Sequence, residues 1–123
     1  KILKEDIKLV IKSLCKRKVC VFQYNHRIYR IINSDINYIE KEPQVKRCII
    51  HTVYDEYYIV NSIERLTKVL GNGFVKTHQS CIINTSNVER INLAKNLIIF
   101  KNGDETSLLS DSMKKGIKKL GLL

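Results

Sequence analysis

Histidines and cysteines are the residues of this chain that could build a metal centre or a nucleophilic site. They are Cys15, Cys20, Cys48, Cys81, His26, His51 and His78. The cysteines form no CxxC pair, no histidine lies at zinc-ligand spacing from a cysteine pair, and no serine stands in a GxSxG motif. Because each cysteine has an apolar neighbour, we expect small buried thiols in a reducing cytoplasm rather than disulfides.

The sequence also gives little support for a phosphate-binding loop or for a metal site built from carboxylates. The segment Gly71-Asn72-Gly73 is too short for a phosphate-binding loop and lacks its Lys-Ser/Thr ending. Carboxylates that could cluster around a metal belong to segments that read as strand tips and turns, where such residues are ordinary: Asp35, Glu40, Glu42, Asp55 and Glu56. We therefore expect no enzyme and no cofactor, with a small hydrolase or nuclease as an alternative to be tested.

Positive charge is the strongest signal in the composition. The 123 residues contain 22 Lys or Arg and 12 Asp or Glu, which gives a net charge of +10. A field of this sign on one small domain attracts a polyanion, so nucleic acid, acidic lipid, an acidic protein and a merely solvated basic surface all remain open. With only 7% aromatic residues, the chain offers no stacking platform for single strands. No apolar run approaches the roughly 20 residues of a membrane-spanning helix.

The first 18 residues read as an amphipathic helix. Apolar residues recur at helical spacing from Leu3 to Leu14, and lysines from Lys4 to Lys16 occupy the other face. Since the chain opens on Lys1, we expect residues 1–18 to be a linker helix from a longer protein and residues 19–123 to be one domain. The same basic helix leaves a second hypothesis open, that of a protein- or membrane-surface interaction module.

Beyond residue 18 the pattern changes to the period of two that is typical of strands. It predicts strands at about 19–24, 27–31, 36–40, 47–53, 57–60, 81–83, 89–93, 97–101 and 105–109. Asn61 begins a predicted helix of about ten residues, and Ser110 a short terminal one. The fold class is therefore mainly β. No two helices are adjacent as in a helix-turn-helix, so loops and strand edges would have to read any bound DNA.

Residues 73–84 carry a family resemblance. The run Phe74-Val75-Lys76-Thr77-His78-Gln79-Ser80-Cys81-Ile82-Ile83-Asn84 resembles the LytTR signature, aromatic-x-basic-x-His-x-Ser-x-x-Val/Ile-Asn. The strand at 87–91, the run 97–103 with its Asn-Gly turn, and the closing helix are also similar to that family. The resemblance covers roughly residues 19–120, and regulators of Gram-positive virulence look like the nearest kin.

The resemblance implies a fold, a partner and a setting. The fold would be an elongated β-β-β sandwich of roughly ten short strands in three sheets, with short helices. Its loops would enter successive major grooves of double-stranded promoter DNA, at paired direct repeats, to control transcription. In the full-length protein, a receiver domain and a sensor histidine kinase would form a cytoplasmic two-component system with it, without membrane association.

The resemblance also assigns roles within residues 76–80. Lys76 takes the basic position and would contact phosphate as a point charge. His78 and Ser80 match the signature and can donate to phosphate or sugar oxygens. Gln79 takes the variable position of a base reader, where its amide could pair with adenine. A structural histidine satisfied by its own turn is the alternative for His78.

Two further segments correspond to DNA-contacting loops of the family. In residues 42–47, Lys46 takes a base-contact position with Arg47 beside it, and an ordinary solvated loop charge is the alternative. In the second segment, Asp111 stands where relatives commonly carry an arginine that reads guanine. Asp111 could accept from cytosine N4, but we expect it to serve the helix N-terminus, while Lys114 and Lys115 hold the backbone. Its neighbours Ser110 and Ser112 complete the candidate site.

Overall fold

Short segments of alternating β-branched and aromatic residues form ten strands among the residues described, which are 19–24, 26–71 and 73–119 of the 123. In this computed structural model the strands are β1 (Val19–Tyr24), β2 (Arg27–Ile32), β3 (Ile36–Lys41), β4 (Cys48–Thr52), β5 (Glu56–Ile59), β6 (Phe74–His78), β7 (Cys81–Asn84), β8 (Val88–Asn92), β9 (Leu97–Phe100) and β10 (Glu105–Thr106). Two α-helices, α2 (Ile63–Leu70) and α3 (Asp111–Lys119), and two 3-10 turns (Asn33–Asp35 and Thr85–Asn87) complete the described part. The helix expected at 3–18 lies outside it.

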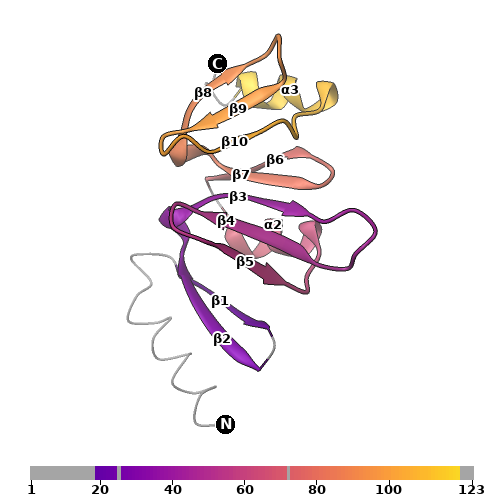
Figure 1. Cartoon of the computed structure of the whole chain (residues 1–123). Coiled ribbons are helices and arrows are strands. Elements are labelled where there is room, and N and C mark those ends of the chain that lie inside the picture. The colour runs from indigo at the N-terminus through magenta and orange to yellow at the C-terminus, as the bar shows by residue number, and fades with distance from the viewer. Residues whose placement is uncertain (1–18, 25, 72, 120–123) are drawn as a thin grey trace.

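The strands form three antiparallel sheets that lie one above another. β1 pairs with β2, the middle sheet has the order β5-β4-β3-β7-β6, and the last sheet has the order β10-β9-β8. Figure 1 shows the hairpin β1–β2 at one end of an elongated molecule and the sheet β8–β10 with α3 at the other. The expected mainly β, three-sheet sandwich is confirmed.

Two separate cores cover the two faces of the middle sheet. On one face Ile39 and Ile50 pack with Leu66 of α2, and the ring of Tyr29 in β2 lies 5.3 Å from that of Tyr57 in β5. On the other face Tyr38, Cys81 and Ile83 pack with Phe100 of β9 and Ile117 of α3. Because both faces are buried, the middle sheet is fixed in place and its strand ends can carry a rigid site.

Three local predictions need correction. The middle helix has eight residues, and its cap is Ser62, whose side chain accepts from the Arg65 N–H; Asn61 instead accepts from the Ser62 N–H. A strand, β6, lies at 74–78, where the pattern predicted none. Its alternation is broken by a bulge between Lys76 and His78. β10 ends at Thr106 rather than at 109, because the chain then crosses to β6, where the Ser110 N–H donates to the Thr77 carbonyl oxygen.

Candidate nucleic-acid interface

The loop between β3 and β4 is closed by its own charged residues. The Glu42 N–H donates to the Arg47 carbonyl oxygen at 3.1 Å, and the Arg47 guanidinium binds both carboxylate oxygens of Glu42. The same guanidinium lies over the ring of Tyr58, 4.7 Å from its centre. Arg47 is thus committed to holding the loop, while Lys46 at its rim is exposed.

The turn between β6 and β7 presents Gln79 to solvent. His78 and Cys81 form the last pair of the two strands, so Gln79 and Ser80 make a two-residue turn. The Ser80 N–H donates to Nδ1 of His78 at 3.1 Å. With Nδ1 accepting, the hydrogen of the neutral ring lies on Nε2, which leaves that atom as a donor. His78 therefore shapes the turn with one nitrogen and can bind a ligand with the other.

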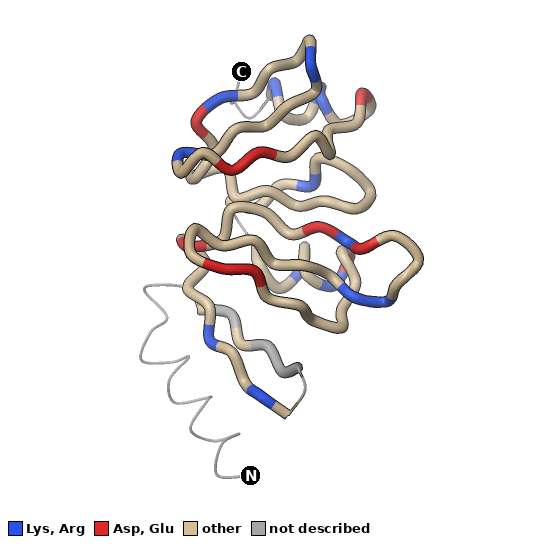
Figure 2. Tube along the Cα trace, viewed as in Figure 1, with Lys and Arg blue, Asp and Glu red and all other residues tan. Residues whose placement is uncertain are grey.

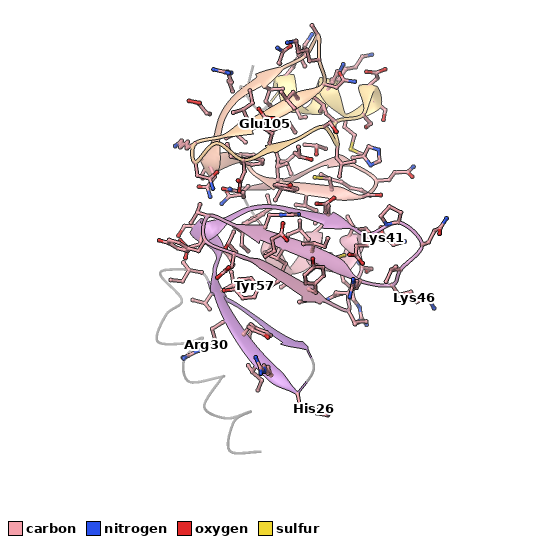
Figure 3. The ribbon with its side chains drawn as sticks, in the orientation of Figure 1. His26, Arg30, Lys41, Lys46, Tyr57 and Glu105 are labelled. Atoms are coloured by element: carbon pink, nitrogen blue, oxygen red, sulfur yellow. The ribbon has the colours of Figure 1, made fainter. Side chains whose placement is uncertain are left out.

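Strand pairing brings the loop and the turn together. β3 lies between β4 and β7, and the Lys41 N–H at its end donates to the Ser80 carbonyl oxygen at 2.8 Å. A groove of about 790 Å³ lies between them. Four of the residues selected from the sequence line it: Lys46, Lys76, Gln79 and Ser80. Figure 3 shows Lys41 and Lys46 at this end of the middle sheet.

Sequence reasoning missed two basic residues of this groove, Lys41 and Arg65. Lys41 reads as an ordinary loop charge after the predicted strand, and Arg65 as a solvated residue of a short helix. Only the pairing of β3 with β7 and the packing of α2 against the middle sheet place them between the loop and the turn. The groove thus has four cationic side chains against one carboxylate, Glu64.

The third selected segment, residues 110–115, does not line this groove. The Thr77 hydroxyl donates to the Leu108 carbonyl oxygen at 2.8 Å, which with the Ser110 bond fixes the start of α3 against β6. The Ser110 and Ser112 hydroxyls lie 3.3 Å apart, and Lys115 is exposed.

Within that segment the charges of Asp111 and Lys114 are paired. The Lys114 Nζ lies 2.9 Å from an Asp111 carboxylate oxygen and 3.4 Å from the Leu93 carbonyl oxygen. Asp111 is 88% exposed and belongs to the first turn of α3, where a carboxylate interacts favourably with the helix dipole. In this arrangement the positive charge of Lys114 is already balanced.

One cluster of acidic residues surrounds His51. His51 lies between Glu40 and Glu56 on the face that carries Tyr38, and its ring stacks on Tyr38 at 4.2 Å. Burial, and then the charge of Glu40, raises the pKa of Tyr38 well above its usual range. Figure 2 shows acidic residues at the start of β5 and around β10, at the opposite end of the middle sheet from the basic rim of the β3–β4 loop. The residues that line the groove are mainly basic, with Glu64 as their one carboxylate.

Two other kinds of site find no support among residues 19–24, 26–71 and 73–119. No group of three or more His, Cys, Asp or Glu side chains there could hold a metal ion. In the same ranges no helix has the length and apolarity to cross a bilayer. Cys48 and Cys81 are buried free thiols, as expected, whereas Cys15 and the side chain of Cys20 lie outside what is described.

Comparison with known proteins identifies the family. The family model of the LytTr DNA-binding domain matches residues 26–121. The fold is similar to the LytTr DNA-binding domain of a protein described as a methyl-accepting/DNA response regulator from Bacillus cereus, with a TM-score of 0.71 and 18% identity over 85% of this chain and 97% of that one. No curated protein gives a significant match to the chain. The chain, with its LytTR signature at residues 74–84, belongs to the LytTR DNA-binding domain family.

Proposed function

We propose that this chain binds double-stranded DNA sequence-specifically, as the effector domain of a bacterial response regulator that controls transcription. The observation that carries the proposal is the basic groove between the β3–β4 loop and the β6–β7 turn. Both segments project from one end of the middle sheet, and a main-chain hydrogen bond between Lys41 and Ser80 links them. Two rigid loops at a fixed separation can enter successive major grooves of the duplex.

The proposed division of labour follows from the chemistry of each side chain. Gln79, exposed at the tip of the turn, would pair its amide with an adenine edge, and Lys46 would contact a base from the other loop. Lys76, Ser80 and the Nε2–H of His78 would hold phosphate or sugar oxygens, which positions the protein without reading sequence. No catalytic step is part of this proposal.

At the third segment we propose backbone contact rather than a base contact. Asp111 would serve the first turn of α3 and keep Lys114 engaged, and Lys115 with the Ser110 and Ser112 hydroxyls would face the phosphates. Base preference at that end of the binding site should then differ from relatives that carry arginine there.

The proposed setting is a cytoplasmic two-component system of the kind found in virulence regulation. Residues 19–123 would form the DNA-binding domain, joined by residues 1–18 to a receiver domain that a sensor histidine kinase phosphorylates. Two copies of the protein would occupy paired direct repeats in a promoter.

Selection of bound duplexes from a random pool tests the proposal. We expect a recurring sequence motif of about two helical turns, bound far more tightly than unselected duplex, with affinity that falls steeply as salt is raised. Enrichment of no motif, or equal binding of selected and unselected duplexes, would reduce the chain to a non-specific polyanion binder.

A further inference from the structure

We infer that the groove between the two loops is a binding site for one phosphate of the DNA backbone, which Arg65 and Lys41 contact. This inference rests on the proposed DNA-binding function and adds two residues that neither the family signature nor the sequence pattern selects. The ligand is a phosphodiester group of the strand that passes between the β3–β4 loop and the Gln79 turn.

The side chains of Arg65 and Lys41 have the right charge and surroundings for this role. Both are exposed and line the groove together with Lys46 and Lys76. Within the described part of the chain, no carboxylate forms an ion pair with either of them, whereas Arg47 and Lys114 are each paired. Four cations that converge on one groove repel one another, and a bound phosphate relieves that repulsion.

The main chain of Arg65 is fixed, and among the described residues its guanidinium forms no ion pair. Its N–H donates to the Ser62 hydroxyl that caps α2, and Leu66, the next residue, is fully buried in the core. The main chain at Arg65 is thus held against the middle sheet, while its guanidinium can present two parallel N–H groups to phosphate oxygens. Lys41 is anchored in the same way by its own N–H, which bonds to Ser80.

The place of the groove, between the two loops, fits a backbone group rather than a base. The groove has a volume of about 790 Å³ and opens between the two segments proposed to read bases. A strand that follows both segments crosses the groove. Arg65 and Lys41 would then set how deeply the β3–β4 loop and the β6–β7 turn enter the DNA, without contributing base preference themselves.

The test combines protein variants with a duplex in which one phosphate at a time is replaced by an uncharged methylphosphonate. The variants are Arg65→Gln, Lys41→Gln and, as matched control, Lys68→Gln, an exposed position of α2 that does not line the groove. Glutamine is a good helix former, so the thermal midpoint should stay unchanged at both helix positions. Affinity is measured on the duplex selected by the full chain.

Arg65→Gln should weaken binding about tenfold for selected and unselected duplexes alike and lower the salt slope by about one. One methylphosphonate position should weaken the wild-type protein most, and at that position Arg65→Gln should cause no further loss. Lys41→Gln should behave in the same way at the same or the adjacent phosphate, and Lys68→Gln should bind as the wild type does.

The failures of the inference and of the proposed function are distinguishable. If the wild type selects a sequence but Arg65→Gln binds with the same affinity as Lys68→Gln, the groove is not the phosphate-binding site and the DNA-binding proposal stands. The same conclusion follows if the loss of affinity in Arg65→Gln adds to the loss caused by every methylphosphonate. If Arg65→Gln changes base preference rather than overall affinity, Arg65 is a base reader and the inference fails as well. If the wild type binds no duplex, both proposals fail.

Discussion

The N–H of Lys41 and the carbonyl oxygen of Ser80 are joined by a 2.8 Å hydrogen bond that ties the end of β3 to the turn between β6 and β7. Since both partners are main-chain atoms, substitution of either side chain leaves the bond in place. The relative position of the two loops is therefore set by the main chain of the middle sheet. Side-chain substitutions can then change the base preference of each loop separately.

Glu42→Gln should have two opposite effects on DNA affinity, because Glu42 carries a negative charge and also forms an ion pair with Arg47. Removal of a carboxylate near DNA should strengthen binding if charge alone decides. Because Glu42 holds Arg47 and closes the loop that carries Lys46, we expect Glu42→Gln to weaken specific binding a few-fold instead. Stability should fall by only about 0.5 kcal/mol, since the pair is partly exposed.

Glu64→Gln is the matched control, because Glu64 lines the groove and no ion pair is recorded for it in the described part of the chain. It should strengthen binding, and a fluorescence anisotropy titration at constant salt compares the two variants. If both strengthen binding equally, the loop is not held by Glu42 in the way the contacts suggest.

His78 has two functions that two substitutions can separate. An asparagine at position 78 can accept from the N–H two residues on, as Nδ1 does now, but it cannot replace the Nε2–H donor. We expect His78→Asn to keep the thermal midpoint and to lose DNA affinity, and His78→Ala to lose both. If His78→Asn binds DNA as the wild type does, the histidine is only structural.

Asp111 should affect stability and DNA binding in opposite directions. Asp111→Asn removes a carboxylate from the first turn of α3 and releases Lys114. We expect a loss of about 0.5 kcal/mol in the free energy of unfolding and a gain in affinity for all duplexes alike. Urea unfolding and a salt titration measure the two effects. Weaker DNA binding would mean that Asp111 contacts the DNA directly.

The buried thiol of Cys81 and the buried hydroxyl of Tyr38 should make the free energy of unfolding sensitive to alkaline pH. Burial raises the pKa of the Cys81 thiol from 9.0 to about 12, and it raises that of Tyr38 as well. Above pH 9 the unfolded chain loses the thiol proton while the folded chain retains it, so the free energy of unfolding falls as pH rises towards 12.

The slope should be at most about 1.4 kcal/mol per pH unit for each such group. Urea unfolding between pH 8 and 10.5 measures it, and Cys81→Ala should be less steep than the wild type. Equal slopes for the two proteins would show that Cys81 does not titrate differently on folding.

Period and turn residues were sufficient to predict most of the strands. The Asn102-Gly103 turn between β9 and β10 forms as expected, with Gly103 at a φ of 96° that suits glycine. The sequence pattern did not predict β6, because the bulge between Lys76 and His78 interrupts the alternation of side chains between the two faces of the strand. Ser62 rather than Asn61 caps α2, a difference of one residue that composition alone does not decide.

The candidate site was only partly accessible from sequence. The signature located Lys76 and Gln79, but the groove depends on β3 pairing with β7, about 40 residues further along the chain. Such long-range pairing leaves no local pattern, so Lys41 and Arg65 could not be selected. Nor could the sequence tell that Arg47 turns towards Glu42 and Tyr58.

The most direct test of the account compares Gln79→Ala with Lys76→Ala on every single-base variant of the selected duplex. Gln79→Ala should abolish discrimination at one base pair, worth about 1–3 kcal/mol, and leave the other positions unchanged. Lys76→Ala should weaken all variants by one common factor. Uniform weakening by Gln79→Ala, or no effect of either substitution, would contradict the claim that this turn reads DNA.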